Sequence, residues 1–126
     1  TNIDFSGGCI ASMKNRNREA RGDMTWLMCD PTQGTTFPEN FFDFVFDKGC
    51  MDAIMCGKEY TEQAAKVVKE VARLLKPGAK YVVFSTGKPA ERIPLFKNKE
   101  YNWKIQLKIV PKAAAQLLMK AEIEEF

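Results

Sequence analysis

Histidine is absent from this chain of 126 residues. Without an imidazole, the chain itself supplies no histidine general base, no Cys/His zinc site and no Ser-His or Cys-His nucleophilic pair. No apolar run approaches the roughly 18 residues that a membrane span needs, and no basic segment leads into an apolar stretch as in a secretory signal. We therefore expect no membrane partner, no histidine-based metal site and no secretory leader.

Cysteine is scarce, and no two cysteines form a C-x-x-C pair; the four are Cys9, Cys29, Cys50 and Cys56. Apolar or small residues flank them, which is typical of reduced, buried thiols. The sequence thus predicts four free thiols rather than two disulfides, a reducing environment and a cytoplasmic location.

The charge balance is nearly even, with 19 basic and 16 acidic residues giving a net charge of +3. Such a small excess does not by itself predict binding to nucleic acid. The lysines of residues 97–112 either contact phosphates or acidic protein, or form the solvated face of an edge strand; the second interpretation is favoured. With 45% hydrophobic residues, the chain has the composition of one globular domain.

Short apolar runs alternate with amphipathic segments along the chain. Strands are expected at 1–4, 24–29, 41–46 and 81–85, with a half-exposed strand at 103–110. Helices are expected after Ser6, from Thr61 to Leu75, where Pro77-Gly78 follows, and at 113–126. Strands alternating with helices predict an α/β fold with a doubly wound, mostly parallel sheet.

Three acidic residues stand where predicted strands end, namely Asp4, Asp30 and Asp47. In doubly wound sheets, ligands bind beyond the carboxyl ends of the strands. Asp4 can accept hydrogen bonds from both hydroxyls of a ribose, and Asp30 from the exocyclic amine of an adenine. Pro31, which follows Asp30, has no N–H to donate to the ring. The alternative interpretations are local: Asp4 caps the turn that follows it, and Asp30 begins a loop before Pro31.

A lysine follows the third acid directly, in Asp47-Lys48-Gly49. Lys48 either binds a ligand carboxylate or pairs with Asp47 or Glu39 at the surface. An exposed pair contributes only about 0–1 kcal/mol, so pairing alone would say little about function.

Five segments in this order resemble the seven-β-strand methyltransferases that use S-adenosylmethionine. They are residues 2–6 (NIDFS), 13–17 (MKNRN), 24–30 (MTWLMCD), 37–53 (FPENFFDFVFDKGCMDA) and 74–78 (LLKPG). The resemblance covers roughly residues 1–86, and its specific part, 37–53, is similar to the branch that includes lysine methyltransferases of translation elongation factor 1-alpha. It implies a Rossmann-like methyltransferase fold and transfer of a methyl group to a protein, at a lysine.

The resemblance also implies the residues that hold the cofactor. These are Asp4, Phe5, Asp30, Pro31, Asp47 and Lys48, with Asp4 on the ribose, Phe5 near the nucleoside, Asp30 and Pro31 at the adenine, and Asp47 at the cofactor or substrate mouth. No metal is implied, and no general base can be assigned. A sulfonium is an activated methyl donor, so alignment of a neutral amine is the main requirement.

The family's glycine-rich loop follows its first strand, and this chain has no such segment before Asp4. The resemblance therefore implies that residues 1–126 are part of a methyltransferase domain, from its second strand onward. The absent strand would lie centrally in the sheet, supplied by upstream residues or by a partner. The alternative functions are a non-catalytic, methyltransferase-like structural or interaction subunit, and a methyltransferase of a small molecule or RNA.

Overall fold

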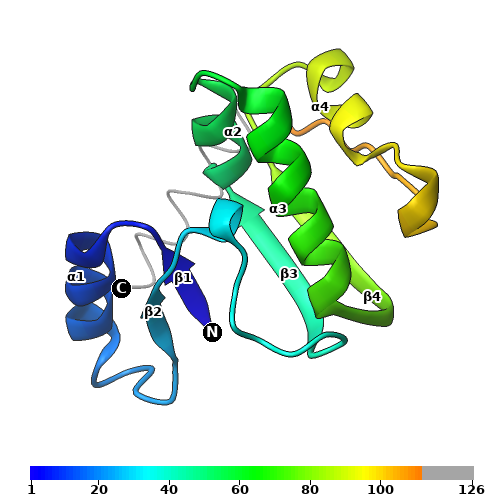
Figure 1. The fold of residues 1–126 in the computed structure, drawn as a ribbon. Helices are drawn as coiled ribbons and strands as arrows, with labels where there is room; N and C mark the ends of the chain where they lie inside the picture. The colour runs from blue at the N-terminus through cyan, green and yellow to red at the C-terminus, as the bar shows by residue number, and fades with distance from the viewer. Residues whose placement is uncertain (112–126) are drawn as a thin grey trace.

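A computed structural model describes residues 1–111 of the chain (Figure 1). Its elements in chain order are β1 (Asn2–Asp4), α1 (Gly7–Asn17), β2 (Trp26–Met28), η1 (Pro31–Gln33), β3 (Phe42–Lys48), α2 (Cys50–Met55), α3 (Tyr60–Leu74), β4 (Leu75–Phe84), α4 (Pro89–Phe96) and η2 (Lys99–Tyr101). The alternation of strands and helices confirms the predicted α/β class.

The described strands form two separate sheets, each of two parallel strands. β1 pairs with β2, placing Asp4 opposite Met28, and β3 pairs with β4, placing Lys48 opposite Phe84. Figure 1 shows α1 beside the first sheet and α3 lying along the second. The parallel pairing confirms the prediction. The separation into two sheets leaves one edge of β1 and one edge of β3 without a strand among the described residues.

Ser6 begins α1 as predicted. Its hydroxyl accepts a hydrogen bond from the backbone N–H of Cys9 at 3.2 Å, which satisfies one of the free amides of the first turn. The helix then continues through a polar segment to Asn17.

The apolar face of α3 forms the core. Its buried side chains are Ala64, Val67, Val68, Val71 and Leu74, and Met51 of α2 and Leu75 pack with them. The i, i+3, i+4 spacing predicted this face. The helix ends at Leu74, and Leu75 already belongs to β4. Pro77-Gly78 therefore lies within β4, where the register shifts between Phe42 and Phe44 and Gly78 takes a φ of 81°.

The β3–β4 sheet has one covered face and one open face. Side chains that alternate along the strands, such as Val45, Tyr81 and Val83, pack against the core on the α3 side. Those between them are exposed: Phe44 (51%), Phe46 (56%), Val82 (40%) and Phe84 (42%). The apolar character of β4 predicts cover on both faces, but the described residues cover only one.

Residues 103–110 form no strand in the structure, and the predicted edge strand is wrong. Alternating apolar residues become a strand only beside an edge that pairs with them, and no described strand does so. Trp103 instead packs its ring against Tyr81 and Tyr101, with centroids 6.0 and 5.1 Å away. The helix expected at 113–126 lies outside the described residues.

All four cysteines are free, but their predicted burial is wrong. Cys9, Cys50 and Cys56 are exposed and Cys29 is partly so. Apolar neighbours do not ensure burial, since Met28, next to Cys29, is itself 69% exposed. Within residues 1–111, no helix has the length and apolarity to cross a membrane.

Candidate functional site

Asp4, the last residue of β1, makes a local turn. Its Oδ1 accepts a hydrogen bond from the backbone N–H of Ser6 at 2.8 Å. The predicted alternative, a turn-capping role, is therefore present. The other carboxylate oxygen accepts no hydrogen bond from the described residues, so it can accept one from a ligand.

Asp30 follows β2 and has the same arrangement. Its Oδ1 accepts from the N–H of Thr32 at 2.9 Å and from the Thr32 hydroxyl at 2.7 Å, which caps the short helix η1 at Pro31. Oδ2 has no hydrogen-bond donor within residues 1–111. Asp4 and Asp30 thus each combine a fixed orientation with one available acceptor atom.

Asp47 differs because its side chain is buried. Its carboxylate accepts from the backbone N–H groups of Cys50 (2.9 Å) and Met51 (3.2 Å) at the start of α2, and from the Tyr81 hydroxyl (3.2 Å). Desolvation raises the pKa of Asp47, although these hydrogen bonds oppose the shift. Both oxygens are occupied by donors of the chain, so Asp47 positions α2 and the β3 end.

The charges of three acids contribute to the pKa of the Cys50 thiol. Burial is the largest cause that raises this pKa to about 11, and the negative charges of Asp47, Asp30 and Asp4 add to it. Asp4 and Asp30 stand at the carboxyl ends of the paired strands β1 and β2, and Asp47 near that of β3.

The remaining residues predicted for the site lie at the same strand ends. Phe5 follows β1 and is 75% exposed. Lys48 ends β3 with an exposed side chain that forms no ion pair in the described part of the chain, so the predicted alternative pairing with Asp47 or Glu39 is not found. Pro31 is partly buried beside Asp30. A positive group and an exposed ring therefore accompany the three carboxylates.

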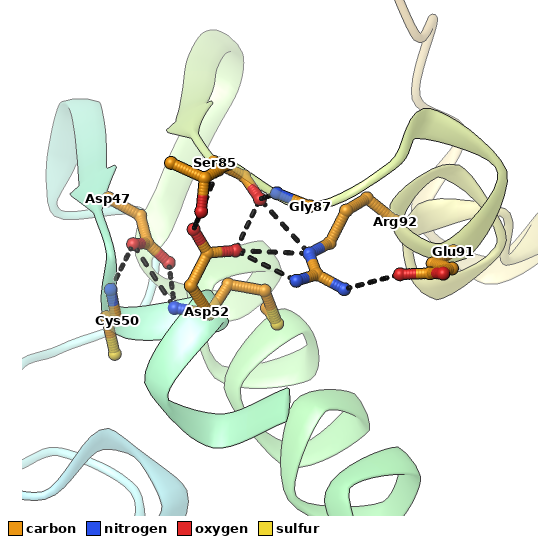
Figure 2. A network of polar contacts seen from close by, with 9 residues as sticks. Asp47, Cys50, Asp52, Ser85, Gly87, Glu91 and Arg92 are labelled. Atoms are coloured by element: carbon orange, nitrogen blue, oxygen red, sulfur yellow. Dashed lines mark hydrogen bonds and ion pairs between the residues drawn. The ribbon is translucent and has the colours of Figure 1, made fainter. Parts of the chain in front are cut away.

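A second polar network joins α2, the end of β4 and α4 (Figure 2). Asp52 accepts hydrogen bonds from the Ser85 hydroxyl, from the Thr86 N–H (2.8 Å) and hydroxyl (3.1 Å), and from Arg92 Nε (3.1 Å) and Nη2 (3.0 Å). Desolvation would raise the pKa of Asp52, but the hydrogen bonds together lower it. The sequence pattern did not single out Arg92, because Pro94 interrupts its helix and only Pro89 marks where that helix begins.

A third network fixes the segment between the two sheets. Glu70 of α3 accepts hydrogen bonds from the N–H and hydroxyl of Thr35 (2.9 and 2.6 Å) and from Arg73 Nε (2.9 Å). Arg73 Nη2 also donates to the Phe37 carbonyl at 2.9 Å. A shallow hollow of about 330 Å³ beside this network is lined by residues of η1 and α3. One lining residue, Thr32, donates hydrogen bonds to Asp30, so the hollow borders that strand end.

No group of three or more metal-binding side chains occurs in residues 1–111. The arrangement is therefore one of available carboxylate oxygens, a lysine and an aromatic ring at the carboxyl ends of parallel strands. Such a set can accept hydrogen bonds from hydroxyls and amines and can contact a flat heterocycle.

Known proteins that are similar to this chain are methyltransferases. Residues 1–83 match the family described as "Methyltransferase domain". The chain is 41% identical over 87 residues to the eEF1A lysine and N-terminal methyltransferase of Xenopus laevis, and 37% identical over 86 residues to that of Homo sapiens. It is 28% identical over 114 residues to EEF1A lysine methyltransferase 4 of Mus musculus.

Each alignment covers more of this chain than of the relative. The alignment with the Xenopus protein covers 68% of this chain and 12% of that protein, and the alignment with the human protein covers 67% and 12%. The alignment with the mouse protein covers 84% of this chain and 44% of that protein. The chain therefore spans a small part of the first two relatives and less than half of the third.

Proposed function

Since this chain belongs to the methyltransferase domain family, we propose that it holds S-adenosylmethionine at the carboxyl ends of β1, β2 and β3, in an enzyme that methylates a lysine side chain of a protein. Family membership implies this cofactor. The single observation that carries the assignment to residues is the position of Asp4 and Asp30 at the ends of the paired strands β1 and β2, each held by a turn hydrogen bond with one carboxylate oxygen available.

The residues at this edge fit the cofactor. The available oxygen of Asp4 would accept from the ribose hydroxyls, and that of Asp30 from the adenine amine. The exposed ring of Phe5 and the ring of Pro31 would contact the nucleoside, and the unpaired ammonium of Lys48 would attract the carboxylate of the methionine part. Asp47, whose oxygens are occupied, would hold the β3 end in place rather than bond the ligand.

The cofactor supplies a methyl group already activated on a sulfonium, so the chain's residues need only bind, align and exclude water. Asp47 and Asp52 are saturated with donors, and neither is available to take a proton. The acceptor lysine would lose its proton by desolvation, which lowers the pKa of an ammonium.

The proposed acceptor is a translation factor. Relatives at 28–41% identity are named as methyltransferases of eEF1A, which supports this class of substrate. A cytoplasmic location is proposed on a different ground, the four free cysteines. Because the chain spans 12–44% of these relatives, substrate choice rests on residues beyond it as well.

We also propose that residues outside this chain, from the same polypeptide or a partner, place one parallel strand between β1 and β3. The N–H of Gly49 donates to the Phe84 carbonyl, so the alternate backbone groups of Phe44 and Phe46 point away from β4. Similarly, the backbone N–H of Asn2 and the carbonyl of Asp4 form hydrogen bonds on the β2 side. The backbone groups of Ile3, which alternate with them, therefore point toward the gap.

Hydrogen exchange tests this strand directly in the full-length protein. The amides of Phe44 and Phe46 should be protected as strongly as that of Gly49, because each would bond to the inserted strand. Fast exchange of both, with Gly49 protected, would contradict the proposed insertion.

Cofactor binding tests the function. We expect the full-length protein to bind S-adenosylmethionine and its demethylated product, and Asp4→Asn or Asp30→Asn to weaken binding roughly 10- to 100-fold, the loss of about 1.5–3 kcal/mol of charged hydrogen bonds. Asp43→Asn is the matched control, because that carboxylate lies at the opposite end of β3 and is 82% exposed. Transfer of labelled methyl to elongation factor 1A, with the lysine located by mass spectrometry, identifies the acceptor.

Absence of cofactor binding by the full-length protein would overturn the proposal. It would favour the second candidate, a non-catalytic interaction subunit. The observation that supports this candidate is the exposed apolar face formed by Phe44, Phe46, Val82 and Phe84. Binding with labelling of RNA or small molecules alone would retain the enzyme and replace the acceptor.

A further inference from the structure

The network around Asp52 gathers three elements at the carboxyl end of β4. Asp52 lies in the first turn of α2, Ser85 and Thr86 follow β4, and Arg92 lies in α4, as Figure 2 shows. The Ser85 hydroxyl also accepts from the Gly87 N–H at 3.1 Å and from Arg92 Nε at 3.1 Å. The loop 85–88 is therefore held by a carboxylate on one side and a guanidinium on the other.

The charged pair within this network is well shielded. The Arg92 side chain is 14% exposed and the Asp52 side chain 20%, at 3.0 Å between Nη2 and Oδ1. Glu91 adds only a distant contact, 3.8 Å from Nη1 and 56% exposed. Shielding strengthens the attraction and makes loss of one partner costly, because the other charge is then left without compensation.

Gly87 is part of the same arrangement. A Cβ at this position would overlap the guanidinium carbon and nitrogens of Arg92. A side chain at position 87 would therefore displace the Arg92 guanidinium from the place where it meets Asp52.

The network lies beside the proposed cofactor site. The backbone amides of Cys50 and Met51 hold Asp47, and Asp52 follows them in the same turn of α2. The Gly49 N–H donates to the Phe84 carbonyl at 3.3 Å, which joins the end of β3 to the residue before Ser85. One helical turn thus connects the Asp47–Lys48 segment with the loop 85–88.

We infer, resting on the proposed function, that Arg92 and Asp52 are positioning residues that fix the loop 85–88 as the rim where the methyl acceptor enters. The loop follows the carboxyl end of β4, the edge at which ligands of such sheets bind. The network does not include Asp4 or Asp30, so it orders the acceptor side without supporting the nucleoside. Its loss should therefore slow methyl transfer and spare cofactor affinity.

The test uses the full-length protein and the variants Arg92→Met, Arg92→Lys and Gly87→Ala. We expect Arg92→Met to lower kcat/KM for the protein acceptor roughly 10- to 100-fold, the range that misalignment produces, while the Kd for S-adenosylmethionine changes less than about threefold. Gly87→Ala, which keeps every polar group, should reproduce the defect by displacing Arg92. Arg92→Lys should recover part of the rate, and Arg16→Met, an exposed arginine on α1, should behave as the unaltered protein.

Hydrogen exchange separates positioning from global destabilisation. The amides of Thr86 and Gly87 should lose protection in Arg92→Met, while core amides such as Val68 keep theirs. Unchanged kinetics in Arg92→Met and Gly87→Ala, in a protein that methylates its acceptor, would overturn the inference alone. If Arg92→Met does not fold, the same comparison is decided by Arg92→Lys and Gly87→Ala. Failure of the unaltered protein to bind cofactor would overturn the proposed function, and this inference with it.

Discussion

Replacing Glu70 by glutamine should loosen the segment that connects the two sheets. The Glu70 carboxylate accepts four hydrogen bonds, two from Thr35 and two from Arg73, and its side chain is 13% exposed. The pKa of Glu70 is lowered from 4.5 to about 2. Hydrogen bonds from Arg73 are the largest cause of this shift. Desolvation opposes it, and the hydrogen bonds from Thr35 add to it. The substitution keeps the shape and removes the charge.

The magnitude follows from the pKa. At 1.36 kcal/mol for each pKa unit, the shift corresponds to an upper bound of roughly 3 kcal/mol for Glu70. Arg73 is 36% exposed, and solvent screening of a pair at the surface reduces this to about 1–2 kcal/mol. The expected loss of unfolding free energy in Glu70→Gln at pH 7 is therefore about 1–2 kcal/mol.

The pH dependence provides the decisive comparison. The native pKa is depressed, so the stabilisation is complete above the unfolded pKa near 4.5 and is lost as the pH falls toward 2. Urea unfolding of the full-length protein and Glu70→Gln should give a difference that shrinks to about half between pH 7 and about pH 3.5. Lys66→Gln, which breaks only the exposed pair with Glu62, is the control and should change stability by less than about 0.5 kcal/mol. A difference that stays constant with pH would refute the electrostatic account.

Three further outcomes are expected. The rate at which iodoacetamide alkylates Cys50, followed by peptide mass spectrometry, should increase with pH up to about pH 11. Asp30→Asn should shift this dependence of rate on pH to lower pH. An unchanged dependence would show that the Asp30 charge does not act on the thiol. Tyr81→Phe removes a hydrogen bond to buried Asp47 and should cost about 1–2 kcal/mol in urea unfolding; no loss would mean that water replaces the hydroxyl. Val68→Ala empties space in the α3 core and should cost about 1–3 kcal/mol by the same measurement, whereas a negligible cost would contradict its close packing.

The sequence predicted what depends on local pattern. The buried face of α3, the Ser6 cap and the parallel strands follow from spacing and turn chemistry within a few residues. Asp4 and Asp30 were found by the same means, since each stands at the end of a strand.

Long-range contacts could not be predicted in this way. Arg92 meets Asp52 across 40 positions, and Glu70 meets Thr35 across 35, so no periodicity connects them. The predicted strand at 103–110 failed for the same reason, because alternation shows that a segment suits a sheet edge and does not reveal whether the segment pairs with one. A signal for Arg92 existed only in Pro89, which is well tolerated in the first turn of a helix.

The unpaired edges of β1 and β3 make two equilibria interdependent. Asp4 stands on one side of the gap and Lys48 on the other, so whatever occupies the gap sets their separation. A nucleotide that contacts both residues would bind more tightly when a strand fills the gap, and that strand would bind more tightly when the nucleotide is present. The two affinities change by the same factor. Ligand affinity would then measure how completely the β1–β2 sheet and the β3–β4 sheet are joined.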